Sequence, residues 1–227
     1  MRTLAPGCMW ILRLFRVALM LCAAPLQAER IPLADLGGLE LRNTRAETVT
    51  YRGRRALKLT EDPGEPGQLL AILRNQSFHD GTIEIDVAGA RSRTAAESDR
   101  GFIGMAFRMQ SDNKHYECIY IRPTNGRAQD QLRRNHSTEY ESLPDWPWYR
   151  LRQESPGVYE SYADMAEGQW MHMKIVVHGR KLYLGGSAEP CLLINDLKLG
   201  DTEGAIALWG GSGTVGYFAN LRISEGQ

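Results

Sequence analysis

The amino-acid sequence predicts an all-β protein built from two packed antiparallel sheets. Three observations predict it. Nearly every interpretable segment after residue 28 alternates apolar and polar residues, and clusters of Gly, Pro, Asn and Asp separate these segments. No segment shows a convincing helical period. About eleven short strands with mostly short turns are typical of a sandwich, and a closed barrel is the alternative.

The strands are expected in the following order along the chain. Most segments alternate apolar and polar residues, AETVTYRG alternates weakly, and QLLAILRN is a more continuous apolar run; turn residues such as SDNK and PTNGR separate them. The expected strands are 46–53, 54–61, 68–75, 81–90, 101–110, 114–123, 170–179, 180–186, 191–196, 204–211 and 214–223.

The segment TIEIDVAG, residues 82–89, shows this alternation most clearly. Ile83, Ile85 and Val87 have one parity, and Glu84 and Asp86 have the other. Residues two apart in a strand share a face, so both carboxylates point the same way. Such a pair is either a solvated face or a candidate for the two acids of a glycosidase.

The amino-terminal 28 residues predict a signal peptide, followed by one domain over 29–227. Three arginines precede the apolar stretch VALMLCAA, and the leader ends in a small residue at Ala28. The apolar stretch is shorter than the roughly 20 residues that span a membrane. We therefore expect export to the periplasm or the extracellular space, and no membrane-spanning segment.

The net charge limits the classes of binding partner that we expect, and the cysteine count limits the disulfides that can form. Without residues 1–28 the chain has 24 basic and 27 acidic residues, a net charge of −3, and it has no basic block. Nucleic acid is therefore not an expected partner. Two cysteines remain, Cys118 and Cys191. They either form a disulfide, which an oxidising compartment allows, or stay as two buried thiols.

One long segment, residues 124–169, departs from the alternating pattern. It is polar but holds several aromatic residues, which favour an ordered loop over a disordered one. We expect a structured excursion over one sheet face, with short strands in it.

Candidate ligand groups gather in and before this segment. Sugars present apolar C–H faces and a rim of hydroxyls, so their sites need flat aromatic rings and planar polar groups. Surface pairing of the arginines with nearby acids is the alternative for any single residue. The candidate ligand-binding residues are Arg108, Tyr120, Arg122, Asn125, Arg134, His136, Trp146 and Trp148.

Several strands together resemble the concanavalin A-like, laminin-G-like jelly-roll superfamily. The segments FHDGTIEIDV, GFIGMAFR, YECIYIRP, INDLKLG, GAIALWGG and TVGYFANLRI carry the resemblance, which covers roughly residues 35–225. Within the superfamily the chain is most similar to bacterial exported domains of the 3-keto-disaccharide hydrolase (DUF1080-type) group. The resemblance implies a jelly-roll sandwich with a curved face that often carries a carbohydrate, and it leaves the reaction open.

Catalysis has weaker support than binding. Retaining glucanases of this fold carry a third acid on the strand, and here Glu84 and Asp86 are followed by Ala88 and Gly89, which cannot donate a proton. Glu117 is a candidate partner for the pair, although it shares the parity of Ile119 and Ile121. His136, in the polar segment, is a candidate base or a hydrogen-bonded loop histidine.

We therefore expect an exported, lectin-like domain that recognises a glycan, without confirmed catalytic residues. The alternatives are a glycoside-acting hydrolase of this fold and an adhesive module whose aromatic loop binds a protein. No pair of His or Cys residues has the spacing of a transition-metal site, and no cofactor is expected. A structural Ca²⁺ held by loop aspartates is possible on chemical grounds.

Overall fold

The computed structural model describes residues 28–65, 67–186 and 190–226, and this part of the chain forms two antiparallel sheets. In spatial order, sheet A contains β13 (Pro190–Ile194), β12 (Lys181–Gly185), β11 (Met171–His178), β6 (Gly81–Arg91), β15 (Thr214–Glu225), β4 (Arg54–Glu61) and β3 (Thr44–Tyr51), and β1 (Glu29–Arg30) also pairs with β15. Sheet B contains β10 (Glu160–Ser161), β9 (Thr138–Leu143), β8 (Tyr116–Ile121), β7 (Ile103–Met109), β14 (Gly204–Gly210), β5 (Leu69–Phe78) and β2 (Leu39–Arg42).

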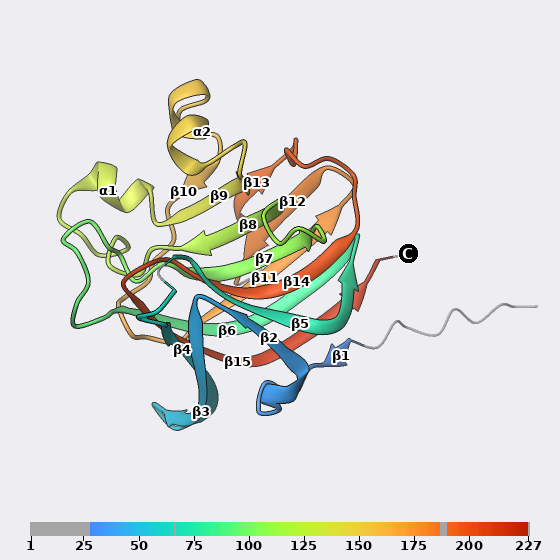
Figure 1. Cartoon of the computed structure of the whole chain (residues 1–227). Coiled ribbons are helices and arrows are strands. Elements are labelled where there is room, and N and C mark those ends of the chain that lie inside the picture. The colour runs from blue at the N-terminus through green and yellow to red at the C-terminus, as the bar shows by residue number, and fades with distance from the viewer. Residues whose placement is uncertain (1–27, 66, 187–189, 227) are drawn as a thin grey trace, which may run out of the picture.

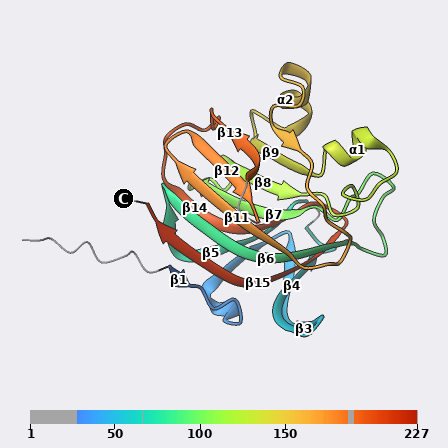
Figure 2. The same ribbon diagram turned by 180° about the vertical axis from the view of Figure 1, so that it is seen from behind.

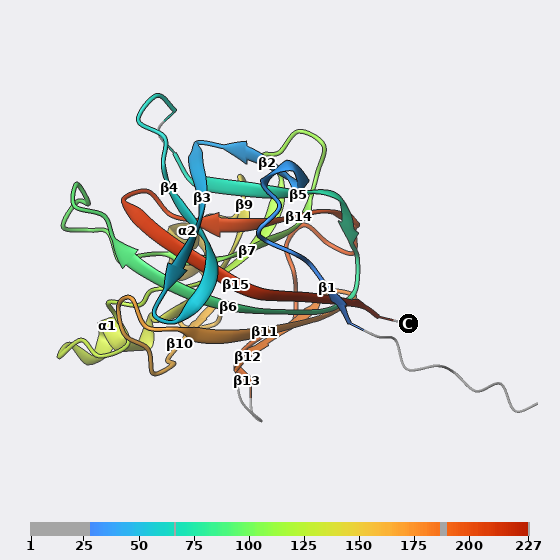
Figure 3. The ribbon, with the colours of Figure 1, turned by 90° about the horizontal axis from the view of Figure 1, so that it is seen from below.

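The two sheets stack face to face. Figures 1 and 2 show the sandwich from opposite sides, and Figure 3 shows β2, β5 and β14 in one layer above β15, β6 and β11 in the other. Consecutive strands cross between the sheets, as β5 of sheet B leads into β6 of sheet A and β14 of sheet B into β15 of sheet A. The predicted all-β, two-sheet antiparallel sandwich is therefore confirmed.

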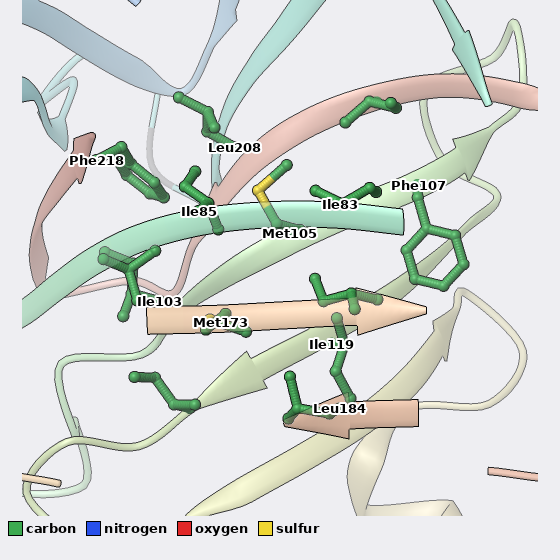
Figure 4. Packing of buried hydrophobic residues seen from close by; sticks show 14 of the residues in the cluster. Ile83, Ile85, Ile103, Met105, Phe107, Ile119, Met173, Leu184, Leu208 and Phe218 are labelled. Atoms are coloured by element: carbon green, nitrogen blue, oxygen red, sulfur yellow. The ribbon is translucent and has the colours of Figure 1, made fainter. Parts of the chain in front are cut away.

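The main core lies between the sheets and follows the predicted alternation. Ile83 and Ile85 of β6 and Met173 of β11 face Met105 of β7 and Ile119 of β8 (Figure 4). These side chains are at most 2% exposed. Each such burial is worth about 1.5–3 kcal/mol relative to an exposed side chain, so the alternation fixes which face of each strand points inward.

Sheet B also has an apolar outer face. Alternate residues of β5, β7, β8 and β14 form a second buried cluster there, which includes Tyr116, Cys118, Tyr120 and Trp209. On sheet A, by contrast, the outer positions of β6 and β11 carry charged residues such as Asp86 and Lys174. The side chains of sheet B that face away from the core are therefore covered by something other than the opposite sheet.

Part of the cover comes from the segment 124–169, whose Trp148 lines one pocket together with Tyr120 and Trp209. It contributes α1 (Gln131–Asn135), β9, α2 (Trp148–Glu154) and β10, and both helices lie beside β9 and β10 at one end of the sandwich (Figure 1). The structured excursion with short strands was predicted correctly, but the two helices were not predicted. They contain five and seven residues, which is too short for a helical period to show in the sequence.

The predicted signal peptide, residues 1–28, lies outside the described residues except for Ala28. Among the described residues, no helix combines the length and the apolar character needed to cross a bilayer.

Candidate functional site

An aromatic floor lies at the centre of the outer face of sheet B. Gly104 of β7 lies between Trp209 of β14 and Tyr120 of β8, with which it is in register. Because Gly104 has no side chain, the two rings stack across it with centroids 4.6 Å apart. A Cβ at this position would lie 2.1 Å from the carbonyl oxygen of Ile119, so only glycine fits.

Two glutamates of β9 extend this face beyond Tyr120. Glu139 is in register with Tyr120, and Glu141 with Cys118, so both carboxyl groups lie on the outer face of the sheet. Both are almost fully buried, at 1% and 2% exposed. Buried carboxyl groups need hydrogen-bond or ion-pair partners, and Glu139 and Glu141 differ in the partners that they have.

Glu139 belongs to a buried charge network. Its carboxylate pairs with Arg122 and lies 3.4 Å from Arg152, which itself donates to Glu160 at 2.6 Å. His136 lies 3.1 Å from Glu160 through Nε2. Burial raises the pKa of Glu139 above its ordinary value although both arginines attract its charged form, and burial lowers the pKa of His136.

The carboxyl group of Glu141 has fewer polar contacts than that of Glu139. Oε2 accepts one hydrogen bond, from the backbone N–H of Trp148 at 3.2 Å. Burial raises the pKa of Glu141 to about 7, although that hydrogen bond and the charge of Arg122 oppose the rise. A substantial part of Glu141 is therefore protonated at neutral pH, and the carboxyl group can donate a proton.

Arg122 lies among aromatic rings. It follows β8, it is 6% exposed, and its guanidinium carbon lies 5.3 Å from the ring centroid of Trp148, 5.6 Å from that of Tyr120 and 5.7 Å from that of Phe102. Within the described residues its Nε has no hydrogen-bond partner. A buried N–H donor without a partner costs free energy, and this nitrogen is also shielded from solvent.

The first turn of α2 places Trp148 at this site. Pro147, just before the helix, fixes the backbone where α2 begins, and the side chains of Trp148 and Arg152 share a helix face because they are four residues apart. The Arg152 guanidinium carbon lies 4.8 Å from the Trp148 ring centroid. Trp148 nevertheless remains 38% exposed, so part of its indole can contact a ligand.

These residues line two adjoining hollows that share Phe102 and Trp148, and we call the two together the groove. The first hollow, the basic pocket, has a volume of about 450 Å³ and is lined by Ser98, Arg100, Phe102, Arg122, Asn125, Asp130, Leu132, Arg133, His136, Trp148 and Arg152. The second, the acidic pocket, has a volume of about 170 Å³ and is lined by Gln68, Asp99, Phe102, Tyr120, Glu141, Trp148, Trp209, Gly211 and Ser212.

Five of the eight predicted ligand-binding residues line the groove: Tyr120, Arg122, Asn125, His136 and Trp148. Asn125 also shapes the loop, because its amide donates to the His136 carbonyl at 2.9 Å and accepts from Arg133 Nε at 2.8 Å. These five residues therefore lie close together, and their role in ligand binding stays a prediction.

The prediction is wrong for Arg108, which is fully buried. Its guanidinium donates to the carbonyls of His79, Gly179 and Gly200 and to Asp80, so it ties three loops together at one end of the sandwich.

Arg134 and Trp146 also lie off the groove. Arg134 donates to the carbonyl oxygens of Ala128 and Gln129 and so stabilises the turn before α1. Trp146 packs under Arg150, whose guanidinium carbon is 3.8 Å from the ring centroid, and beside Lys198. These two residues hold the excursion in shape, and neither lines a pocket of the groove.

The candidate acid pair Glu84 and Asp86 does not belong to the groove. Both lie on the outer face of sheet A, on the opposite side of the molecule. Asp86 accepts from Arg54 at 2.6 Å and from Asn220 at 2.7 Å and contacts His172 at 2.9 Å. The pair therefore belongs to a polar outer face, as the alternative of a solvated face predicted, but Asp86 is buried by its partners.

Glu117 is an interior residue of the sandwich, and it cannot act together with Glu84 or Asp86. Its carboxylate accepts from the Tyr140 hydroxyl at 2.6 Å and from the Leu199 N–H at 2.8 Å. Burial raises the pKa of Glu117. The parity with Ile119 and Ile121 indicated this core-facing position in the sequence.

The two cysteines do not form a disulfide. Both thiols are free, and they lie on different sheets: Cys118 is buried on the outer face of sheet B, and Cys191 is in β13 of sheet A. The alternative of two buried free thiols is therefore correct in the absence of a bond between them and in the burial of Cys118, whereas Cys191 is only half-buried.

One cluster has the composition of a cation site. Single ligand atoms of His79, Asp80 and Asp201 lie within 4.8 Å of one another. The Arg108 guanidinium lies 2.9 Å from Asp80 and 3.6 Å from Asp201 and already balances part of their charge. The cluster is remote from the groove residues and adds nothing to the chemistry of the groove.

Sequence reasoning missed Phe102, Glu141, Arg152 and Trp209 of the groove, and the two carboxylates Glu139 and Glu160 that pair with its arginines. A signal was present for two of them. In TEYESL, Glu139 and Glu141 alternate with Tyr140, as in a strand with two acids on one face. The polarity of the surrounding segment hid this strand.

Comparison with known proteins supports the fold. No family model matches the chain, and no curated protein matches it. Among solved structures, the chain is similar to the carbohydrate-binding module CBM66 from Bacillus subtilis, with a TM-score of 0.58, 15% identity, and coverage of 82% of this chain and 96% of the module.

Two further similarities have lower identity. One is to the exoplasmic/lumenal domain of VIP36 in its Ca²⁺/Man₃GlcNAc-bound form, with a TM-score of 0.52, 10% identity and coverage of 84% of each chain. The other is to the β-glucanase of Bacillus licheniformis, with a TM-score of 0.51, 10% identity, and coverage of 88% of this chain and 98% of the enzyme. The chain thus has the concanavalin A-like, galectin-like jelly-roll sandwich fold.

Proposed function

We propose that this chain is an exported carbohydrate-recognising domain that binds a glycan in the groove on the outer face of sheet B. The observation that carries the proposal is the arrangement around Arg122. The Arg122 guanidinium lines the basic pocket with its central carbon 5.3–5.7 Å from the ring centroids of Trp148, Tyr120 and Phe102, and Tyr120 itself stacks on Trp209. The composition of the leader, residues 1–28, supports export.

The groove chemistry fits a sugar. Aromatic rings pack against the apolar C–H face of a pyranose or furanose ring, and planar guanidinium and amide groups make paired hydrogen bonds to adjacent hydroxyls. The two hollows together have the size of a site for a short oligosaccharide. The named ligand types of the similar structures, a carbohydrate-binding module and a glycan-bound lumenal domain, support the same class of ligand.

A glycan array with a matched pair of variants tests the proposal. Trp148→Ala removes the exposed ring of the groove, and Tyr149→Ala removes the neighbouring ring of α2, which is 62% exposed and lines neither pocket. We expect the native chain to bind at least one glycan class, Trp148→Ala to lose at least tenfold in affinity, and Tyr149→Ala to keep it. Equal binding by both variants, or binding of no glycan by the native chain, would overturn the assignment.

A second candidate function, hydrolysis of the bound glycoside, is favoured by one observation. The Glu141 carboxyl lines the acidic pocket and its pKa is raised by burial to about 7, as in a general acid that protonates a leaving oxygen. Asp99 lines the same pocket and supplies a second carboxyl group. The resemblance of the sequence to the 3-keto-disaccharide hydrolase group supports the same candidate.

Product analysis separates the two candidates. The native chain is incubated with each glycan that it binds, and new reducing ends are measured over time. Hydrolysis that is lost in Glu141→Gln while binding is retained would establish the enzyme. Intact glycans after prolonged incubation would leave recognition as the function of the groove.

A further inference from the structure

We infer that the ligand of the groove is an acidic glycan, whose anionic group, a uronate carboxylate or a sulfate ester, lies in the basic pocket. The inference rests on the proposed function, because it names the class of sugar that the same groove takes. It follows from the charges that line the basic pocket and from how each of them is balanced.

Four arginines line the basic pocket, and Asp130 is the single carboxylate among its lining residues. Two of the arginines form ion pairs with buried carboxylates, Arg122 with Glu139 and Arg152 with Glu160. The other two, Arg100 and Arg133, pair with no carboxylate in the described part of the chain. Arg100 donates to the carbonyls of Glu97 and Asp99, and Arg133 to Asn125 Oδ1 and Thr124 Oγ1.

The single carboxylate, Asp130, is already engaged. It precedes α1, and its Oδ1 accepts from the backbone N–H of Arg133 at 3.2 Å, as an N-cap does. The pocket therefore keeps an excess of positive charge. Burial lowers the pKa of Arg100, and the nearby charges of Arg133 and Arg122 lower it further, which reflects how closely these guanidinium groups lie.

An anion on the ligand would offset the repulsion among Arg100, Arg122 and Arg133, which all line the basic pocket. Guanidinium groups bind carboxylates and other oxyanions through two parallel N–H donors, which neutral hydroxyls match less well. The neighbouring rings of Phe102 and Trp148 would then hold the sugar that carries the anion.

The two pockets of the groove differ in charge, and this difference favours one orientation of a ligand that has a single anionic residue. The basic pocket lies on one side of Phe102 and Trp148, and the acidic pocket with Glu141 and Asp99 lies on the other. An anionic sugar in the second pocket would meet two carboxyl groups. We therefore place the anionic residue in the basic pocket and an uncharged residue of the same chain in the acidic pocket.

The test uses pairs of glycans that differ only in charge. The pairs are oligogalacturonate and its methyl ester, a glucuronan oligosaccharide and the corresponding β-glucan, and a sulfated galactan oligosaccharide with and without its sulfate. We expect the acidic member of a bound pair to bind at least tenfold more tightly than the neutral one, and added NaCl to weaken it. The carboxylate pairs and the sulfate pair show which anion is recognised.

Substitutions of arginines in the basic pocket test whether this pocket causes the preference for acidic glycans. Arg133→Gln and Arg100→Gln should each reduce the preference for the acidic member by about tenfold. Arg127→Gln, an exposed arginine that pairs with Asp164 and lines neither pocket, should leave it unchanged. Circular dichroism and thermal melts confirm that each variant is folded.

The outcomes for the two proposals are distinguishable. Equal binding of both members of every bound pair, or an unchanged preference in Arg133→Gln and Arg100→Gln, would overturn the acidic ligand while carbohydrate recognition stands. Absence of binding to every acidic and neutral glycan would overturn both.

Discussion

Replacing Glu141 by Gln should make the protein more stable at alkaline pH and leave its stability unchanged in acid. Glutamine keeps the shape of the protonated carboxyl group and can accept the hydrogen bond from the Trp148 N–H. It cannot ionise, so the variant removes one titration and little else. The prediction follows from the position of Glu141, which is 2% exposed and has that one hydrogen-bond partner.

The sign follows from proton linkage. Burial raises the pKa of Glu141 from an ordinary 4.5 to about 7. Below pH 4.5 the group is protonated in both the folded and the unfolded state and has no effect on the free energy of unfolding. Between pH 4.5 and 7 the folded state holds the proton and the unfolded state releases it, so stability falls as the pH rises. Above pH 7 both states are ionised and the loss is complete.

The magnitude follows from the size of the pKa change. One pKa unit corresponds to about 1.4 kcal/mol, so a rise from 4.5 to about 7 costs the native chain about 3 kcal/mol above pH 7. Glu141→Gln should therefore match the native chain at pH 4 and exceed it by about 3 kcal/mol at pH 8.5. Urea titrations at half-unit pH steps, followed by tryptophan fluorescence, measure the difference.

Glu225→Gln is the matched control, since Glu225 lies exposed at the end of β15 and has no side-chain partner among the described residues. It should run parallel to the native chain across the whole pH range. Parallel curves for Glu141→Gln between pH 5 and 8 would refute the argument that Glu141 is protonated by burial, and with it the basis for a proton donor in the groove.

Three further predictions concern the frame of the site. Gly104→Val should destabilise the chain by about 3 kcal/mol or more in urea titration, because a Cβ there lies 2.1 Å from the Ile119 carbonyl oxygen, and should weaken the near-UV signal of the stacked rings. Tyr140→Phe should cost about 1–3 kcal/mol, because Glu117 loses a donor at 2.6 Å and the Lys198 N–H an acceptor at 2.7 Å. A thiol reagent should label half-buried Cys191 in the native protein and fully buried Cys118 only after unfolding, as read by peptide mass spectrometry.

The fold could be predicted from the sequence because its strands obey a period of two. From Ile83 to Val87 in β6 and from Met171 to Val177 in β11 the inward positions are apolar, and a shift of one residue would bury Glu84 or Lys174. The helices of the excursion could not be predicted in the same way. The position of α2 depends on Pro147 and on contacts with β9, and α1 is a single short turn capped by Asp130, so neither helix has a periodic pattern that the sequence could show.

The site was predicted in part, and Arg108 shows one reason why. Alternation along 103–109 puts Arg108 on the face opposite Ile103 and Phe107 and thus toward a ligand. In the structure Arg108 has a φ of 51°, a left-handed conformation that is rare for a non-glycine residue, and the pairing of β7 with β14 shifts register beside it. The guanidinium reaches the loop carbonyls of Gly179 and Gly200, and no local pattern in the sequence encodes that contact.

Glu139 and Glu141 show the other reason. Their importance depends on which strand lies beside β9, because register with Tyr120 and Cys118 places them on the groove face. Pairing partners are not visible in a single sequence. The arginines of the basic pocket are equally dispersed: Arg100 comes from the loop before β7, Arg122 from the end of β8, and Arg133 from α1. A chain with no basic block can therefore still build a basic pocket.

The residues that maintain the fold are thus different from the residues that select the ligand. The floor of the groove, with Tyr120, Gly104 and Trp209, belongs to three adjacent strands and cannot change without disturbing sheet B. The charged groups stand mostly on loops and short helices above it, where a substitution alters recognition at small cost in stability. Arg100 and Arg133 donate only to neutral oxygens in loops, so neutral replacements there should change the class of glycan bound while the sandwich stays intact.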